Sequence, residues 1–253
     1  MNLILLKKEE ISSGRAILND RRARHIAGVL KPKAGEWLRV GILNGKAGTA
    51  KVESIDKGIV TLASFNLDKD PPTPWFDIML AIPRPKVLHR LWAPLASLGV
   101  RQIILLNAAK VEKCYFDTHW LNPDSYTPLL QEGLEQSCTT QMPSVEIIKA
   151  FKPFIEDQIP QRFQNAPKLV AHPRLNGNNR PLKPFTQNPP QDADLPLIAI
   201  GPEGGWTEFE LSLLEKADFK PLTLGDRALR TDIAIAAIAG ALSGATVTAN
   251  NSN

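Results

Sequence analysis

Cysteine is scarce in this chain, and the two cysteines present do not indicate metal or disulfide chemistry. Cys114 and Cys138 are the only ones among 253 residues, and their spacing matches no metal-binding or redox motif. The four histidines are scattered, without the spacing of metal ligands or of a nucleophile–base pair. We therefore expect no metal and no disulfide scaffold, and two free thiols in a reducing compartment.

Long apolar runs are missing as well. The chain begins MNLILLKKEE, in which only four consecutive residues are apolar before the charges follow. A secretory signal needs about 7–15 apolar residues, and a membrane-spanning helix needs about 20. We therefore expect no membrane partner and a cytoplasmic location.

Acidic residues are outnumbered in one part of the chain only. The net charge is +4, and residues 1–73 hold 13 Lys+Arg against 8 Asp+Glu, whereas the remainder holds 17 against 18. The stretch RRARHIAGVLKPK has no acid, and its cationic or titratable side chains are Arg21, Arg22, Arg24, His25, Lys31 and Lys33. A small basic module of this kind favours RNA or another polyanion, with a solvated basic face as the alternative.

The first 65 residues alternate between short apolar runs and turn signals. Asn-Gly at 44–45 separates two such runs, which is a strong hairpin signal. A helix is expected over 20–30, with Asp20 as its N-cap. Strands are expected over residues 3–6, 36–42, 48–55 and 59–65. This pattern is typical of a small β-barrel, an architecture that commonly binds oligonucleotides.

A proline-rich segment follows. Residues 66–75 (NLDKDPPTPW) are expected to be a linker that packs neither as strand nor as helix, which divides the chain into domains 1–70 and 76–249. From residue 76 onward, continuous apolar runs alternate with helical patterns, which predicts an α/β domain with a mostly parallel sheet. Strands are expected over 76–82, 101–106, 145–148, 169–171, 197–200 and 221–224. Helices are expected over 88–98, 126–137, 153–163, 207–217 and 232–242, the last apolar on nearly all sides and so expected to be buried.

Two strand–loop units near the C-terminus are the strongest functional signal. In LIAIGPEGGWTEFEL and PLTLGDRALRTDIAIAAIAGAL, an apolar run ends at a glycine and a charged, glycine-containing loop leads into a helix. Glycines there allow positive φ and close approach of a ligand, and Thr207 with Glu210 forms a capping box. Because parallel strands end at one edge of the sheet, the two loops predict a pocket there, with plain tight turns as the alternative. Neither loop is a dinucleotide or P-loop motif.

Four cations near these strand ends are candidates for contacts with an anion or a base. Arg227 and Arg230 lie three residues apart in the second loop, just before the last helix. Arg84 and Lys86 follow another strand in the sequence PRPK, where they meet a phosphate backbone or belong to a solvated turn.

These motifs together resemble the RsmE family, the 16S rRNA uracil-N3 methyltransferases of the SPOUT superfamily. IGPEGGWTEFEL followed by LGDRALRTDIAIAAIAGAL is similar to the family's C-terminal signature. RHIAGVLKPKAGE resembles the beginning of its PUA-like barrel, and LGV at 98–100 and LEQS at 134–137 also match. The sequence departs from the family's pattern at Thr139, Lys31 and Asp232, and in the helix before LGV.

The resemblance implies a PUA-like RNA-binding barrel joined to a SPOUT domain with a deep trefoil knot. It implies S-adenosylmethionine as cofactor, 16S rRNA or the small ribosomal subunit as partner, and a homodimer whose subunits complete each other's site, with the last helix as the dimer contact. The cofactor residues that it implies are Ala171, His172, Pro173, Ile200, Gly201, Pro202, Glu203, Gly204, Gly205, Leu222, Leu224, Gly225, Arg227, Leu229 and Arg230.

Methylation of uracil N3 requires removal of a proton, and a nearby cation stabilises the anion that develops. Arg230 is the candidate for this role, with Asp232 orienting it or accepting the proton. The alternative hypothesis is a non-catalytic RNA-binding ribosome-assembly protein that retains the methyltransferase fold.

Overall fold

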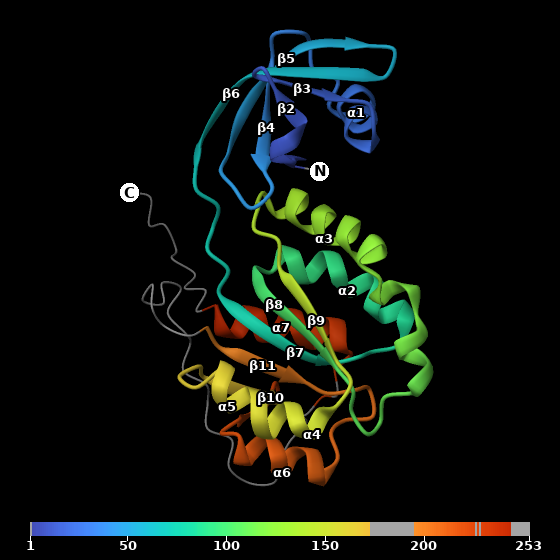
Figure 1. The fold of residues 1–253 in the computed structure, drawn as a ribbon, viewed down its shortest axis with the longest axis vertical. Coiled ribbons are helices and arrows are strands. Elements are labelled where there is room, and N and C mark those ends of the chain that lie inside the picture. Colours follow the sequence, from blue (N-terminus) through green and yellow to red (C-terminus); the bar gives the residue numbers. More distant parts are fainter. Residues whose placement is uncertain (1, 173–194, 226, 228, 244–253) are drawn as a thin grey trace. The chain divides into compact units, whose positions relative to one another are not determined.

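The fold is described from a computed structural model, in which residues 2–172, 195–225, 227 and 229–243 are described. The chain forms two compact units, each with one six-stranded sheet (Figure 1). The first unit comprises Met1–Pro74, Trp92–Gly99 and Pro123–Pro143; the second comprises Trp75–Leu91, Val100–Asn122 and Ser144–Asn253. The division into domains 1–70 and 76–249 stays a prediction.

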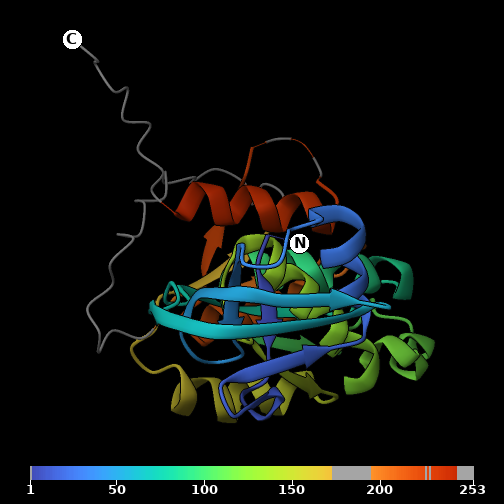
Figure 2. The ribbon, with the colours of Figure 1, turned by 90° about the horizontal axis from the view of Figure 1, so that it is seen from above.

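The first sheet is antiparallel except at one pair. Its order is β1-β4-β5-β6-β3-β2, and only β1 and β4 are parallel among its pairs of described residues. Figure 2 shows the long β5–β6 pair side by side. The strands are β1 Ile4–Leu6, β2 Ile11–Ser12, β3 Arg15–Leu18, β4 Trp37–Ile42, β5 Ala47–Asp56 and β6 Ile59–Lys69, with a 3₁₀ turn η1 at Lys8–Glu10. Alternate residues of these strands form one buried apolar cluster, as a half-buried barrel requires.

Two parts of this sheet differ from the sequence prediction. The β2–β3 hairpin was not predicted; its turn is Ser13-Gly14, with φ of 50° and 73°, so the Ser-Gly dipeptide was the available signal. The predicted linker was wrong over 66–69, because β6 continues to Lys69 and pairs with β5. Gly48 permits this pairing, since a Cβ there would lie 1.9 Å from the Asn66 carbonyl oxygen.

The predicted helix at 20–30 is confirmed with a change of form halfway. Helix α1 (Arg21–His25) begins at Asp20, whose carboxylate accepts a hydrogen bond of 2.8 Å from the Arg22 N–H. It continues as a π-helical segment, η2 (Ile26–Leu30), and ends at Lys31 in the left-handed region.

Helices α2 (Pro85–Ser97) and α3 (Pro123–Ser137) begin three residues before their predicted starts. Both begin at a proline, whose fixed φ and missing N–H suit the first turn of a helix. In the first unit, Gly133 of α3 lies against α2, and a Cβ there would be 2.1 Å from the Ala93 carbonyl oxygen.

The second sheet is entirely parallel among its described pairs, as predicted. Its order is β12-β10-β11-β7-β8-β9. Strands β7 and β11 are buried at every position, which explains sequences that are apolar throughout except at Asp77, whose carboxylate accepts hydrogen bonds from Arg101. The strands are β7 Phe76–Ala81, β8 Val100–Leu106, β9 Ser144–Ile148, β10 Lys168–Ala171, β11 Leu197–Ile200 and β12 Lys220–Leu222.

The remaining helical segments belong to the second unit. They are η3 Lys113–Asp117, η4 His119–Leu121, α4 Phe151–Pro153, η5 Phe154–Gln158, α5 Ile159–Arg162, α6 Glu208–Lys216 and α7 Thr231–Leu242. The prediction that the last helix is buried on nearly all sides was wrong for the single chain: Ile235, Ile238 and Leu242 are buried, but Ile233 is 53% exposed. No helix within the described residues is long and apolar enough to span a membrane.

Candidate active site

A cavity of about 370 Å³ lies where three neighbouring strands of the parallel sheet end. Ala171, Ile200 and Leu222 are the last residues of β10, β11 and β12, and the register pairs Ala171 with each of the other two. All three line the cavity. Because the strands are parallel, the loops that follow them meet at this edge.

The first wall of the cavity is the loop 201–205 and the start of α6. Gly205 has φ of +71°, and a Cβ there would meet nothing within 4 Å. Gly201 packs against the indole of Trp206, because a Cβ there would lie 3.0 Å from Nε1. The predicted capping box is present: Glu210 accepts hydrogen bonds from the N–H and the hydroxyl of Thr207, both at 2.8 Å.

The loop and the start of α6 accept three hydrogen bonds from other segments. Glu210, 3% exposed, accepts a bond of 2.7 Å from the Ala109 N–H. Lys110 Nζ donates to the Gly204 carbonyl oxygen at 2.7 Å, and the Arg84 N–H donates to Glu203 Oε1 at 3.2 Å. Two of these bonds, to Glu203 and Gly204, tie the glycine loop to neighbouring segments.

The second wall is the segment after β12 together with the start of α7. Gly225 has φ of +98° with open space around its Cα, so the backbone can approach a ligand there. The Arg230 side chain, 64% exposed, donates to Asp232 Oδ2 at 2.9 Å. Asp232 Oδ1 accepts from the Ile233 N–H at 3.1 Å, so both carboxylate oxygens are engaged.

The residues present fit an S-adenosylmethionine site. Trp206 is 4% exposed and lines the cavity, and its buried Nε1–H has no partner in the part of the chain that the structure describes. An unpaired buried donor is costly in a protein interior and is satisfied by an acceptor from a ligand. Open glycine backbone suits the polar parts of a cofactor, and the apolar side chains of Ile200, Leu222 and Ile238 suit a flat base.

The cavity gathers most of the predicted cofactor residues. Those that line it are Ala171, His172, Ile200, Gly201, Pro202, Glu203, Gly205, Leu222, Leu224, Gly225, Arg227, Leu229 and Arg230. Gly204 does not line it, since the loop turns this residue toward Lys110, and Pro173 lies outside the described residues. Their role in binding the cofactor stays a prediction.

Sequence reasoning missed four lining residues: Trp206, Thr231, Ala234 and Ile238. The last three are spaced at i, i+3 and i+7, which places them on one face of α7. This periodicity was the available signal. The periodicity was difficult to recognise because nearly every residue of the helix is apolar, so the sequence does not distinguish one face from another.

The predicted RNA-contacting cations fall into two groups. Arg24, Lys31, Lys33, Arg84 and Lys86 are exposed. Arg22 is not: its side chain is 12% exposed and pairs with Glu10 at 2.5 Å and Asp20 at 2.8 Å. The hydrogen bond to Glu10 is the main reason that the pKa of Arg22 is raised. An RNA contact by Arg22 therefore finds no support in this geometry.

The other two predicted RNA-contacting residues are also partly engaged. Arg21 pairs with Glu135 at 2.7 Å and remains 35% exposed. His25 is half-buried, and its Nε2 has no partner in the described part of the protein. Within the same residues, no group of three or more His, Cys, Asp or Glu side chains could hold a metal ion.

The sequence matches two family models, one in its N-terminal part and one over the rest of the chain. An RNA methyltransferase domain model matches residues 70–243, and an RNA methyltransferase PUA domain model matches residues 18–63. Ribosomal RNA small subunit methyltransferase E of Treponema pallidum is 30% identical over 247 residues, which cover 94% of this chain and 88% of that protein. The Bacillus subtilis protein of the same name is 25% identical over 239 residues, 91% of each chain.

The fold is also found among solved structures. A crystal structure of ribosomal RNA small subunit methyltransferase E from Neisseria gonorrhoeae, bound to S-adenosyl methionine, has a TM-score of 0.68 to this chain. The two are 23% identical, and the match covers 95% of this chain and 96% of the other. The α/β fold with an N-terminal PUA domain, expected from the resemblance, is thereby confirmed.

Proposed function

The chain belongs to the ribosomal RNA small subunit methyltransferase E family, and on that premise we propose that it methylates N3 of a specific uridine in 16S rRNA. It is an S-adenosylmethionine-dependent RNA methyltransferase. The observation that carries the proposal is the cavity at the ends of β10, β11 and β12, because it is lined by the two loops in which the family resemblance is strongest.

S-adenosylmethionine, when bound, supplies an electrophilic methyl group on a sulfonium. The chain's part is to hold the cofactor and the base in line, because alignment is the main requirement of such a displacement. Gly201, Gly205 and Gly225 offer backbone to the polar parts of the cofactor, and Trp206 Nε1–H offers a donor. The apolar part of the lining would shield the adenine of a bound cofactor from water.

Arg230 is the proposed catalytic residue. Its exposed guanidinium lies at the cavity, where it is available to an entering base and stabilises the negative charge that develops when N3 loses its proton. Asp232 is its positioning residue. Because both Asp232 oxygens already accept hydrogen bonds, orienting Arg230 is favoured over accepting the proton.

The test is Arg230→Ala, assayed for N3-methyluridine in 16S rRNA or small subunits from cells lacking this gene. Methylation should fall by roughly a hundredfold or more, the usual effect of removing a donor aimed at developing charge. Cofactor affinity, measured by calorimetry, should stay within a few-fold. Exposed Arg90→Ala is the matched control, and full activity of Arg230→Ala would overturn the assignment.

The alternative function, a non-catalytic assembly protein, is disfavoured by relatives named as methyltransferases and by the intact loops. A single measurement distinguishes a methyltransferase from an assembly protein. Calorimetry with S-adenosylmethionine should give binding, and its absence would favour the assembly protein.

A homodimer and a trefoil knot belong to the same proposal. The exposed face of α7, with Ile233 at its centre and Ala236 and Ala241 beside it, is apolar and suits a second copy of the chain. Ala234 and Ile238 on the same helix line the cavity, so dimerisation would bear directly on the site. Light scattering should give a dimer for the native chain and a monomer for Ala236→Glu.

The exposed cations of the first unit and the PRPK segment are proposed to contact rRNA phosphates. Arg24, Lys31, Lys33, Arg84 and Lys86 are the candidates, and binding through them should weaken with salt. We place the protein in the cytoplasm, where an enzyme that acts on the small ribosomal subunit meets its substrate.

A further inference from the structure

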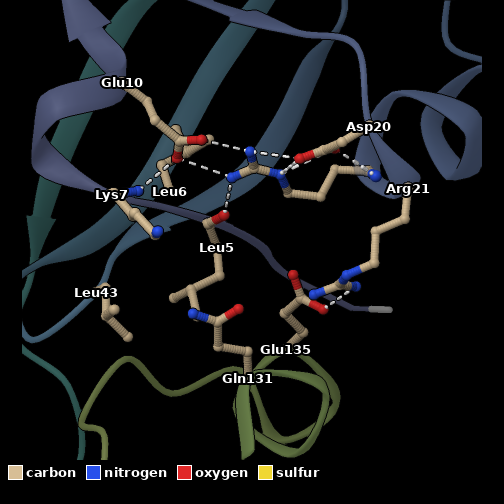
Figure 3. Close-up of a pocket in the computed structure, with 10 residues that line it drawn as sticks. Leu5, Leu6, Lys7, Glu10, Asp20, Arg21, Leu43, Gln131 and Glu135 are labelled. Atoms are coloured by element: carbon tan, nitrogen blue, oxygen red, sulfur yellow. Dashed lines mark hydrogen bonds and ion pairs between the residues drawn. The ribbon is translucent and has the colours of Figure 1, made fainter. Parts of the chain in front are cut away.

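A second cavity, of about 190 Å³, is lined by residues of the first unit alone. Figure 3 shows Glu135 and Gln131 rising from α3 into this cavity, toward the strand that carries Leu5. The two residues are four apart and therefore share one face of the helix. The function proposed above does not use this site.

Glu135 is buried, yet one of its oxygens has no partner among the described residues. The residue is 1% exposed, and Oε2 accepts a hydrogen bond of 2.7 Å from Arg21 Nη1. Oε1 is buried and accepts nothing within the described residues. In Figure 3 this second oxygen points into the cavity, away from the bond to Arg21. A buried carboxylate oxygen in this state requires a donor.

Arg22, one of the three cations on the cavity lining, does not serve Glu135. The Nη1 and Nη2 groups of Arg22 already donate hydrogen bonds of 2.5 to 2.9 Å to Glu10, Asp20 and the Leu5 carbonyl oxygen. The charges on the lining balance, with Lys7, Arg21 and Arg22 against Glu10, Asp20 and Glu135. A neutral ligand that donates to Glu135 therefore fits better than an anion or a cation. The Gln131 amide adds a donor and an acceptor beside it.

We propose that this cavity binds the amino-bearing edge of an unpaired nucleobase of the RNA substrate. Cytosine is the simplest case: its exocyclic N–H donates to Glu135 Oε1, and its ring N3 accepts from the Gln131 amide. Uracil places a keto oxygen where cytosine has the amino group, so two acceptors would face each other. The base bound here is therefore different from the uridine that is methylated. This inference rests on the proposed RNA binding.

The test compares oligo(C) and oligo(U) of ten nucleotides, which differ only at the base edge that the cavity reads. Fluorescence anisotropy with the full chain should give about tenfold tighter binding of oligo(C), the size expected for a two-bond base contact. In Glu135→Gln the amide oxygen can keep the bond to Arg21 and turn its NH₂ toward the cavity. The preference should then vanish or reverse toward oligo(U).

Exposed Glu132→Gln, on the same helix and with the same charge change, is the control and should keep the preference. Gln131→Leu leaves the Glu135–Arg21 pair intact and should lower oligo(C) affinity several-fold, so the test does not depend on the folding of Glu135→Gln. Equal binding of both oligonucleotides by the native chain, or a preserved preference in Glu135→Gln, would overturn the proposal.

Methyl transfer to rRNA and cofactor affinity are separate measurements, because the cofactor cavity belongs to the second unit. A native chain that methylates uridine but does not discriminate between the oligonucleotides would contradict this inference alone. A chain that discriminates but does not methylate would contradict the proposed function alone.

Discussion

The two cavities of this protein are lined by different kinds of residues. The cavity at the sheet edge is lined mostly by glycine backbone and apolar side chains, with Arg227 and Arg230 among its charged residues. Its buried donor Trp206 Nε1 has no partner among the described residues. The cavity in the first unit is formed by ion pairs, and its unpaired buried atom is an acceptor, Glu135 Oε1. The first can be reshaped by adding one methyl group, whereas the second is sensitive to the loss of one charge.

The largest change in stability is expected from Arg22→Met. Arg22 is nearly buried between Glu10 and Asp20, and its removal leaves two carboxylates without a cation. The cost should be about 2 kcal/mol of unfolding free energy, less than for fully buried pairs because both acids are partly exposed. Denaturant unfolding measures this loss. Exposed Arg24→Met should change little, and a fall in cofactor affinity would contradict the separation of the two sites.

A smaller effect, on binding and not on folding, is expected from Gly201→Ala. The added Cβ would lie 3.0 Å from Trp206 Nε1, so the indole must shift within the cavity. Calorimetry should give S-adenosylmethionine affinity reduced by roughly tenfold, which corresponds to about 1.4 kcal/mol. Gly204→Ala is the matched control in the same loop. Its Cβ would meet only the flexible Lys110 side chain, so this variant should bind S-adenosylmethionine with unchanged affinity.

Trp206→Phe tests the unpaired donor itself. If the indole N–H donates to the cofactor, affinity should fall several-fold, while the free protein loses no hydrogen bond, because this donor has no partner among the described residues. Trp92→Phe is the control, because Trp92 Nε1 also has no partner among the described residues but Trp92 does not line the cavity. Unchanged cofactor affinity in Trp206→Phe would show that the donor is not used.

The smallest effect is expected in the pH dependence of stability under acidic conditions. The hydrogen bond from Arg22 is the main reason that the pKa of Glu10 lies below its ordinary value of 4.5. The contribution of Glu10 is therefore present above about pH 4.5 and is lost as the pH falls through the folded-state pKa. Glu10→Gln should flatten the pH dependence of unfolding between pH 5 and pH 3. Exposed Glu9→Gln should leave the slope unchanged.

The sequence predicted most of the parallel sheet, because buried strands are read from continuous apolar runs. It also predicted the two loops of the cofactor cavity, through their glycines and the Thr207–Glu210 capping box. It missed the extension of β6, because proline and charge in 66–75 outweighed a pairing that depends on Gly48 in a distant strand. It overestimated the burial of α7, because an all-apolar helix does not reveal which face is covered.

What the sequence determined by itself was the local chemistry: the caps, the turns, the alternation of strands and helices, and the residue types of both loops. Tertiary structure decided which polar atoms found partners. Arg22 looked like a free cation in a basic stretch, yet Glu10 and Asp20 neutralise it. Glu135 lies in the LEQS motif, which did not indicate a cavity, yet it lines one, and its Oε1 has no partner among the described residues. Hydrogen bonding between distant segments depends on their placement in space, which no local pattern encodes.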